Sequence, residues 1–337
     1  MRYFYAALVT AVFVVAGTWW WMAARVGHAA GSSSTATTFV VSEGEQLRSV
    51  AVRLESERLI QSAPAWTLYT ILQGQRSAIL AGSYELDPTM TGREILATLT
   101  KPLKDTEVKV TIPEGLTNQE VAALLEKSEV IAATNFMAAV SVKDSREILT
   151  KEYAFLLDKP ATADLQGYLF PDTYRFFKHS SASDVLQKFL DNFDARVSTS
   201  LRQSAQAQGR TLFEELTMAS ILEKELTTDA DRAMGADVFW KRLAIGMPLQ
   251  SDATVNFVTG KSKLQPSNAD TNVDSPYNTY QNKGLPPGPI NNPGISALRA
   301  AINPTSNPYY YYLTAGGKTY FSKTLEEHNE YKRRYLQ

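Results

Sequence analysis

Two separated stretches of the chain, residues 41–60 and 112–131, share one residue pattern, and this repeat restricts the folds open to the sequence. Each stretch reads as a strand, a glycine turn, an amphipathic helix and a short apolar exit. A further strand and turn over residues 82–88 and a helix start over residues 90–96 lie between them. The matching positions are Glu43-Gly44 with Glu114-Gly115, Val50-Ala51 with Val121-Ala122, and Leu54-Glu55 with Leu125-Glu126. The repeat predicts an α/β subdomain over residues 39–135.

A strand–glycine–helix unit of this kind resembles the LysM-like modules of cell-wall proteins. The resemblance implies glycan binding. The pattern by itself is equally compatible with a small α+β spacer packed on the next domain. Two copies are too few to form a solenoid.

Composition excludes several classes of function. The 337 residues carry a net charge of −1, so no basic excess is available to neutralise the phosphates of a nucleic acid. The absence of cysteine excludes disulfides, thiolate nucleophiles and cysteine zinc sites. His28, His179 and His328 are scattered, and no spacing favours a metal site or a serine–histidine–aspartate triad. We expect no metal and no cofactor.

Residues 3–24 form an almost uninterrupted apolar run of membrane-spanning length. Arg2 and Arg25 flank the run, and Trp19–Trp21 stand where an aromatic belt is expected. The pattern favours an uncleaved N-terminal transmembrane anchor, residues 1–25, over a cleaved signal peptide, because Ala29-Ala30-Gly31 is a poor cleavage site. We expect a single-pass protein of the inner (cytoplasmic) membrane, a polar linker over residues 26–38 and an exported, periplasmic domain.

Two acidic residues occupy unusual positions in the stretch 211–226. Thr211 and Glu214 form a capping-box pattern, and apolar residues then recur at helical spacing, which predicts an amphipathic helix. Glu223 and Glu225 both project into or along the edge of the apolar arc. Burial disfavours the charged form of a carboxylate and raises its pKa, as a general acid requires. Periodicity does not choose between the two acids, and either one could be an ordinary residue at the rim of the helix.

The remaining segments predict a cleft in a mixed α+β domain over residues 136–337. The proline- and glycine-rich run 284–294 cannot be regular structure, and it follows the polar and aromatic segment 277–280. Amide, hydroxyl and tyrosine side chains suit sugar hydroxyls and pyranose faces. We also expect a helix over 229–243, a β-hairpin over 308–322 and a final helix over 325–336 that contains His328 in a structural role.

Several ordered motifs resemble one family, the YceG-like proteins, which are membrane-anchored endolytic murein transglycosylases known as MltG. The motifs are Gly-Tyr-Leu-Phe-Pro-Asp-Thr-Tyr from Gly167, Ala-Ser-Ile-Leu-Glu-Lys-Glu from Ala219, Leu-Gln-Ser-Asp from Leu249, Tyr-Asn-Thr-Tyr from Tyr277, Gly-Leu-Pro-Pro-Gly-Pro-Ile from Gly284 and the Asn-Pro-Gly that ends at Gly294. The resemblance implies cleavage of nascent peptidoglycan strands between N-acetylmuramic acid and N-acetylglucosamine, leaving 1,6-anhydro-muramic acid ends and terminating chain growth. It implies glycan strands as substrate and peptidoglycan synthases as partners.

The resemblance places the catalytic glutamate in the Glu-Lys-Glu motif, and we assign it to Glu225, with Glu223 as the alternative. The residues expected to line the sugar subsites are Gln250, Asp252, Tyr277, Asn278, Thr279 and Tyr280.

The chain departs from the family pattern at Gln166, where members often have an acid, and at Ala253, where many have proline. Two other functions stay open. A hydrolytic muramidase would need a second carboxylate, with Asp252 or Asp172 as candidates. A glycan-binding scaffold would need none.

Overall fold

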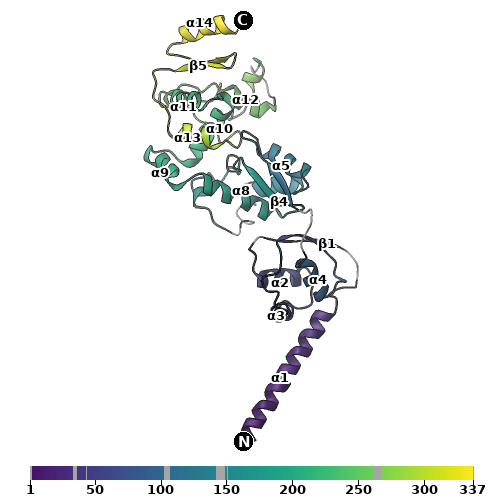
Figure 1. Ribbon diagram of the computed structural model, residues 1–337. Helices are drawn as coiled ribbons and strands as arrows, with labels where there is room; N and C mark the ends of the chain where they lie inside the picture. The colour runs from purple at the N-terminus through teal and green to yellow at the C-terminus, as the bar shows by residue number, and fades with distance from the viewer. Residues whose placement is uncertain are drawn as a thin grey trace. The chain divides into compact units, whose positions relative to one another are not determined.

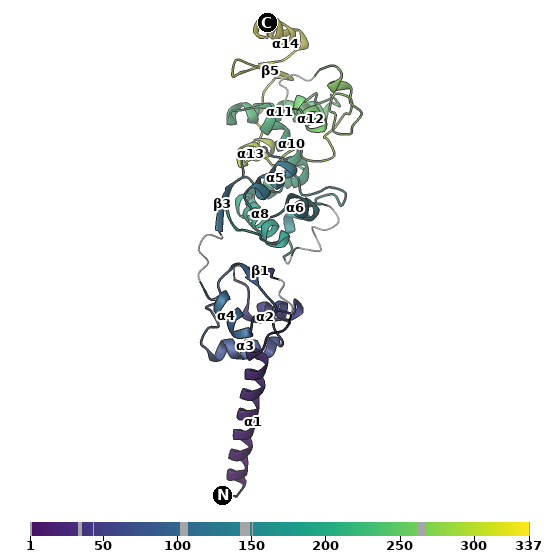
Figure 2. The ribbon, with the colours of Figure 1, turned by 90° about the vertical axis from the view of Figure 1, so that its right-hand side faces the viewer.

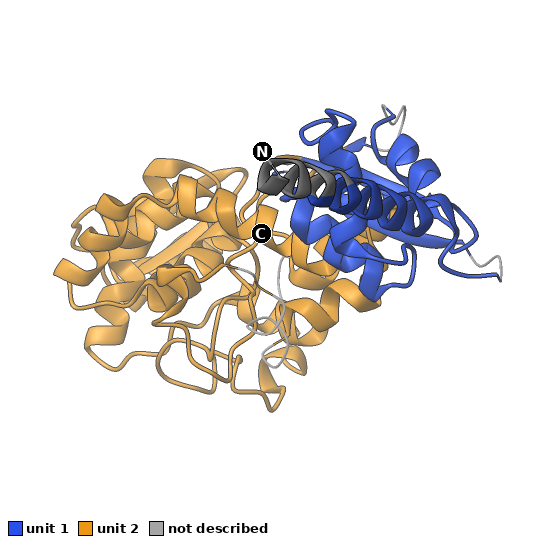
Figure 3. Cartoon of the chain, turned by 90° about the horizontal axis from the view of Figure 1, so that it is seen from below, with its two compact units in different colours: residues 1–108, 175–181 blue, residues 109–174, 182–337 orange. Residues whose placement is uncertain are grey.

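The computed structural model describes residues 2–32, 36–42, 44–101, 107–141, 149, 151–261 and 267–336, with the side chains of residues 2–9, 11 and 12 outside this set. The chain divides into two compact units: residues 1–108 with 175–181, and residues 109–174 with 182–337 (Figure 3). Both units combine helices with small two-stranded sheets, so the predicted α+β class is confirmed.

Unit 1 contains one antiparallel sheet and the helices that cover it (Figure 1). Strand β1 (Thr37–Val41) pairs with β2 (Gly82–Leu86), with Phe39 opposite Tyr84. The chain between the strands forms α2 (Leu47–Ser56) and α3 (Ala63–Leu72), and α4 (Gly92–Leu99) follows β2. Trp66 is buried in the core of this unit and donates from its indole nitrogen to the carbonyl oxygen of Gly92 at 2.8 Å. This bond fixes α3 against the start of α4.

Helix α1 (Arg2–Gly27) begins the chain, and its C-terminal end belongs to the core of unit 1, where Met22 and Val26 are buried. Within the residues that the structure describes, no helix has both the length and the apolar character needed to cross a membrane. The predicted transmembrane helix is therefore not confirmed, and part of the predicted anchor lies outside the described side chains.

The predicted linker, residues 26–38, makes several contacts within unit 1. Ala29 forms an isolated antiparallel bridge with Thr91 and accepts a hydrogen bond from Gln61, and the amide of Gly31 donates to Pro88. Residues 33–35 lie outside the described residues. The contacts on both sides of that gap tie much of this segment to unit 1.

The two copies of the predicted internal repeat share several backbone features. The second copy consists of β3 (Glu107–Thr111), α5 (Asn118–Lys127), α6 (Ala133–Val140) and β4 (Thr173–Phe177), and β3 pairs with β4. Gly44 and Gly115 both have positive φ, 75° and 80°, which explains the glycine in each turn. Arg58 and Glu129, at corresponding places after the first helix, both have φ of 58°.

The division between the units does not follow the predicted subdomain boundary. The prediction grouped residues 39–135, whereas the contacts place residues 109–135 in unit 2, and α6 continues across position 135.

The fully buried side chain of Asn292 links the second repeat copy to the rest of unit 2. Its Oδ1 accepts from the amides of Gly167 and Leu169 at 2.8 and 3.0 Å, and its Nδ2 donates to Leu116 O and Asn118 Oδ1 at 3.0 and 3.1 Å.

The rest of unit 2 is mainly helical. Its elements are η1 (Ala154–Leu156), α8 (Ala182–Arg196), α9 (Thr199–Ala207), α10 (Leu212–Glu225), α11 (Asp229–Ala244), α12 (Asp252–Thr259), η2 (Asp270–Asn272), α13 (Ile295–Ile302), β5 (Tyr311–Ala315), β6 (Lys318–Ser322) and α14 (Leu325–Tyr335). The predicted helix over 229–243, the hairpin and the final helix are confirmed.

Helix α10 is the centre of unit 2. It starts with the predicted capping box, in which Thr211 and Glu214 satisfy each other's backbone amides, and it contacts α9, α11, α12 and α13. The expected single apolar face is wrong: residues 215–222 are all buried, including Glu215 and Thr217. The hydroxyls of Thr217 and Ser220 donate to carbonyls one turn back, so these small polar side chains enter the core without unpaired donors.

Candidate active site

A cleft of about 1870 Å³ runs through unit 2. Its lining residues come from α5, α6, the end of α10, α12, the segment 277–291, β5 and α14. In both Figure 1 and Figure 2, α10 and α12 lie between α5 and the β5–α14 end of the unit. Small-molecule pockets usually measure 300–1,000 Å³. A cleft of this volume and extent has room for a polymer.

Glu225, the last residue of α10, presents its carboxylate to this cleft. Oε1 accepts hydrogen bonds from Ser251 Oγ at 2.5 Å and from the amide of Ala253 at 3.2 Å. Oε2 accepts from the hydroxyl of Tyr312 at 2.8 Å. Three donors from two other segments therefore hold both oxygens of one acid.

Opposing effects act on the pKa of Glu225. Burial raises the pKa, the neighbouring Asp252 raises it further, and the donors Ser251, Tyr312 and Ala253 lower it, with a net upward shift. Burial favours the protonated acid, while the three donors stabilise the carboxylate that remains after the proton has left. A group with this balance suits a reaction in which it gives up a proton and later takes one back.

The start of α12 is arranged around Glu225. Ser251 is the N-cap residue of α12, but its hydroxyl makes no capping bond to its own helix and donates to Glu225 instead. Glu225 then accepts the N–H of Ala253, one of the amides that a helix N-terminus leaves without a partner. Thr279 holds this arrangement, because its hydroxyl accepts from the amide of Ser251 at 3.0 Å.

Glu223 lies in a different environment. Its Oε1 pairs with Arg232 Nη2 at 2.8 Å, and its Oε2 accepts from the amide of Gly294 at 3.0 Å. The Glu223 side chain is only 7% exposed and does not line the cleft. Both of its oxygens have partners that tie α10 to α11 and to the start of α13. The geometry thus separates two acids that periodicity could not tell apart.

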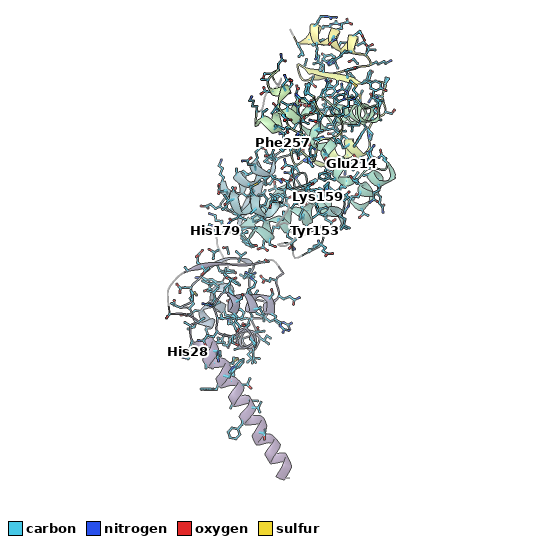
Figure 4. The ribbon with its side chains drawn as sticks, turned by 180° about the vertical axis from the view of Figure 1, so that it is seen from behind. His28, Tyr153, Lys159, His179, Glu214 and Phe257 are labelled. Carbon is cyan, nitrogen blue, oxygen red and sulfur yellow. The ribbon has the colours of Figure 1, made fainter. Side chains whose placement is uncertain are left out.

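Four of the six predicted subsite residues line the cleft: Gln250, Asp252, Tyr277 and Tyr280. Tyr280 donates from its hydroxyl to Asp252 Oδ1 at 2.5 Å. Gln250 adopts a left-handed backbone with φ of 53°, which costs a non-glycine residue of order 1–3 kcal/mol and is typical of functional sites. Phe257 of α12, labelled in Figure 4, packs its ring 5.1 Å from that of Tyr277 on the same wall.

The structure does not bring Asn278 and Thr279 to the cleft surface. Both side chains are buried. Asn278 donates to the carbonyls of Thr271 and Val273 at 3.0 and 2.8 Å, so it holds its own loop. The two buried polar residues stand between two partly buried tyrosines that line the cleft, so the whole Tyr-Asn-Thr-Tyr segment resembled a subsite in the sequence.

Three residues near Glu225 were missed by sequence reasoning: Ser251, Tyr312 and Arg242. Arg242 lines the cleft and donates to the carbonyls of Leu249 and Tyr310 at 2.7 and 2.8 Å, so it joins the segments that carry Ser251 and Tyr312. Ser251 could have been noticed as an N-cap residue before a helical run. Nothing in the sequence distinguishes Tyr312 from the neighbouring tyrosines.

Asp172 and Gln166, two further residues considered in the sequence analysis, both make hydrogen bonds within the fold. Asp172 does not line the cleft; partial burial opposes ionisation, but bonds from Thr173, Asn192 and Arg196 give its pKa a net downward shift. Gln166 accepts from the amide of Asn118 at 2.7 Å, at the start of α5.

His328, expected to be structural, lines the cleft and stacks on Tyr311, and burial followed by the charges of Lys332 and Arg242 lowers its pKa to about 4. Among the described residues, no three histidine or acidic side chains form a group that could hold a metal ion.

Comparisons with known proteins place the chain in one family. The sequence profile of the YceG-like family matches residues 39–334. A protein of Bacillus subtilis (strain 168) named endolytic murein transglycosylase is 33% identical over 311 residues, which are 90% of this chain and 86% of that protein. A protein of the same name from Streptococcus pneumoniae serotype 2 (strain D39 / NCTC 7466) is 29% identical over 321 residues, and the match spans 88% of this chain and 58% of the relative.

The chain is also similar to a solved structure of a yceG-like protein. A yceG-like protein of Listeria monocytogenes superposes with a TM-score of 0.58 at 33% sequence identity, over 88% of this chain and 98% of that structure. The profile match covers both units, from β1 to α14, and includes every residue that surrounds Glu225. The chain belongs to the YceG-like family.

Proposed function

We propose that this chain is an endolytic murein transglycosylase that cleaves nascent peptidoglycan strands between N-acetylmuramic acid and N-acetylglucosamine. Family membership and the names of the Bacillus and Streptococcus relatives support the activity. The large cleft supports a polymeric substrate. The product ends are 1,6-anhydro-muramic acid residues, so each cut ends a glycan chain.

We assign the catalytic role to Glu225. The observation that carries this assignment is the set of three donors on a half-buried, cleft-facing carboxylate whose pKa is raised. Glu223 lacks access to the cleft and is held by Arg232 and Gly294. To act as a general acid, Glu223 would first have to carry a proton, and the neutral acid would leave the Arg232 guanidinium without its ionised partner.

The reaction uses one carboxylic acid twice. Protonated Glu225 donates its proton to the glycosidic oxygen as the bond from that oxygen to the anomeric carbon of muramic acid breaks. The C6 hydroxyl of the same muramic residue then attacks the anomeric carbon, and its proton passes to the Glu225 carboxylate. Glu225 is thereby protonated again, and no water is consumed.

Two features of this chemistry set the demands on the site. Holding the C6 hydroxyl close to the anomeric carbon replaces the activated water of a hydrolase, which is a proximity effect. General acid–base assistance of this kind contributes roughly a hundred- to ten-thousand-fold in rate. Ser251, Ala253 and Tyr312 stabilise the carboxylate between the two proton transfers.

We place the sugar subsites along Gln250, Asp252, Tyr277 and Tyr280, which line the same cleft as Glu225. The tyrosine rings offer faces for pyranose stacking, and Gln250 and Asp252 offer groups for sugar hydroxyls. Asn278 and Thr279 support this wall from behind, because they hold the loop and the Ser251 amide.

The remaining parts of the chain position the enzyme. Residues 1–25 attach the protein to the inner membrane, supported by the apolar run 3–24 and by the exposed side chains of Phe13, Val14, Trp19 and Trp20. The catalytic residues act outside the cytoplasm, and peptidoglycan synthases are the expected partners. The βααβ arrangement of unit 1 supports a LysM-like, glycan-binding role for that unit.

A digest of uncrosslinked glycan strands by the full-length protein tests the proposal, with Glu225→Gln and Glu223→Gln alongside and strand ends identified by mass spectrometry. We expect anhydro ends from the wild type and the Glu223 variant, and none from the Glu225 variant. Reducing ends would indicate a muramidase that uses Asp252 as its second carboxylate. Glycan binding without any cleavage would indicate a scaffold.

A further inference from the structure

The charged side chains along the cleft divide into two groups. Most have a partner within unit 2. Lys261 pairs with Asp270, Arg242 donates to two carbonyls, Glu120 accepts from Thr117, Asp164 from Gln166, Asp252 from Tyr280, and Glu225 from three donors. Lys224 and Lys332 differ, because in the described part of the chain their ammonium groups form no hydrogen bond or ion pair with protein atoms.

The two lysines approach the cleft from different sides of Glu225. Lys224 precedes Glu225 and extends toward the turn before α5, where its Nζ lies 3.3 Å from the position a Cβ on Gly115 would take. Lys332 stands on α14, one helical turn after His328, and lies close enough to Asp252 for its charge to oppose the rise in the pKa of that carboxyl. Figures 1 and 2 place α5 and α14 on opposite sides of α10 and β5.

We infer that Lys224 and Lys332 form two anion subsites that bind carboxylates carried by the lactyl arms of muramic acid on either side of the scissile bond. The inference rests on the proposed function, because it concerns the substrate of that same cleft. It adds a requirement that the activity alone does not contain: the enzyme recognises strands by the charge of their substituents.

The chemistry of the glycan supports this choice of ligand. The two sugars of the strand share their acetamido groups and most hydroxyls, and only muramic acid carries a lactyl arm. The arm ends in a free carboxylate on a strand without peptides, and in a stem peptide with its own carboxylates on a nascent strand. A lysine ammonium is a flexible point charge with three donors, which suits a carboxylate whose position varies. A strand that spans the cleft presents such arms to both ends.

The partner-free state of the two lysines has a physical consequence. An ammonium that pairs with a protein carboxylate must lose that partner before it binds an anion, whereas Lys224 and Lys332 are already available. Charge-assisted hydrogen bonds with a ligand typically stabilise a complex enough to change affinity by roughly ten- to a hundredfold. We expect each lysine to contribute less than this range, because both sites are open to water and salt.

Three strand preparations test the inference with the full-length protein: strands that carry stem peptides, strands stripped to the lactyl carboxylate, and stripped strands whose carboxylates are converted to methylamides. The variants are Lys224→Met and Lys332→Met. Lys318→Met serves as the matched control, since Lys318 is an exposed lysine of β6 that does not line the cleft.

We expect each variant to lose about three- to tenfold in kcat/KM on strands with carboxylates and to match the wild type on methylamide strands. Lys224→Arg and Lys332→Arg should restore most of the loss, and added salt should shrink the difference. The control should match the wild type on all three. A loss confined to peptide-bearing strands assigns the carboxylates to the stem peptide, and a loss confined to stripped strands assigns them to the lactyl group.

Other outcomes would overturn the inference. An equal loss on methylamide strands would mean that the lysines act through Glu225 or through folding, and no loss on any strand would mean that they bind nothing. The proposed function fails separately: if the wild type makes no anhydro ends on any of the three preparations, the activity itself is wrong.

Discussion

Tyr312 donates a 2.8 Å hydrogen bond to Glu225 Oε2, although the two residues are 87 positions apart in the chain. Tyr312 stands on β5, and its ring meets that of Phe239 of α11 edge-on, with centroids 5.7 Å apart. The hairpin of β5 and β6 is therefore part of the candidate active site, because its Tyr312 bond lowers the pKa of the acid to which we assign the catalytic role.

Replacing Tyr312 by phenylalanine should shift the pH dependence of cleavage upward. In the proposed reaction Glu225 acts first as an acid, so activity should fall as pH rises through its pKa. The Tyr312 bond stabilises the carboxylate and lowers that pKa, so its loss raises the pKa further. The high-pH limb of kcat/KM should move to higher pH. Tyr320→Phe, a change on β6 at a residue stacked on Tyr335, should leave the limb in place. A limb that stays or moves to lower pH in Tyr312→Phe would contradict this account.

Glu223→Gln should weaken the fold and spare the chemistry. The change removes the charge that pairs with Arg232, whose side chain is only 10% exposed, while glutamine can still accept one hydrogen bond. We expect the free energy of unfolding to fall by roughly 1–3 kcal/mol, measured by urea denaturation. Glu225→Gln is the matched control: it should abolish cleavage with a smaller loss of stability. Loss of cleavage in Glu223→Gln at unchanged stability would reverse the two assignments.

Asn292→Ala should be among the most destabilising changes in unit 2. The asparagine side chain satisfies the amides of Gly167 and Leu169 and the side-chain oxygen of Asn118, and alanine would leave these three groups without that partner. The Leu116 carbonyl would keep the bond from the backbone amide of residue 292. Each unsatisfied buried group costs about 1–3 kcal/mol, so the total should exceed about 3 kcal/mol unless water enters. Asn329→Ala, at an exposed position of α14, should change the free energy of unfolding by less than about 0.5 kcal/mol. Similar midpoints for the two variants in urea would show that Asn292 does not hold the second repeat copy in unit 2.

Gly167→Ala should cost more than the backbone conformation alone requires. Gly167 has φ of 93°, and a Cβ there would lie 2.7 Å from Cγ of Pro289 in the proline- and glycine-rich loop. Gly209→Ala separates the two effects, because Gly209 has φ of 72° and open space around its Cβ position. The strain of the left-handed backbone costs of order 1–3 kcal/mol at both sites. We expect a larger drop in thermal midpoint for Gly167→Ala, together with reduced cleavage, since Pro289 lines the cleft. Equal drops would rule out a steric role for Pro289.

Local signals in the sequence predicted the elements because the interactions that form them span only a few residues. The capping box of Thr211–Glu214 and the β-hairpin within residues 308–322 both formed where the patterns placed them. The repeat was visible because each copy needs a glycine with positive φ at Gly44 and Gly115. The sequence also showed two acidic residues, Glu223 and Glu225, that project toward the apolar arc at the end of one helix.

The choice between those acids depended on residues far away in the chain. Glu223 and Glu225 have the same chemistry and nearly the same helical position, so their roles differ only through their neighbours. Arg232 and Gly294 hold Glu223, whereas Ser251 and Tyr312 reach Glu225 at the cleft. The burial of α10 on all sides could not be predicted from the sequence either. Thr217 and Ser220 are polar residues, and they are buried because their hydroxyls donate to carbonyls within the helix. The sequence determined by itself which elements form and which side-chain chemistry is available. Tertiary packing decided that Glu223 is held by Arg232 and Gly294 and that Glu225 faces the cleft, because burial and partners, rather than residue type, set the protonation of a carboxylate.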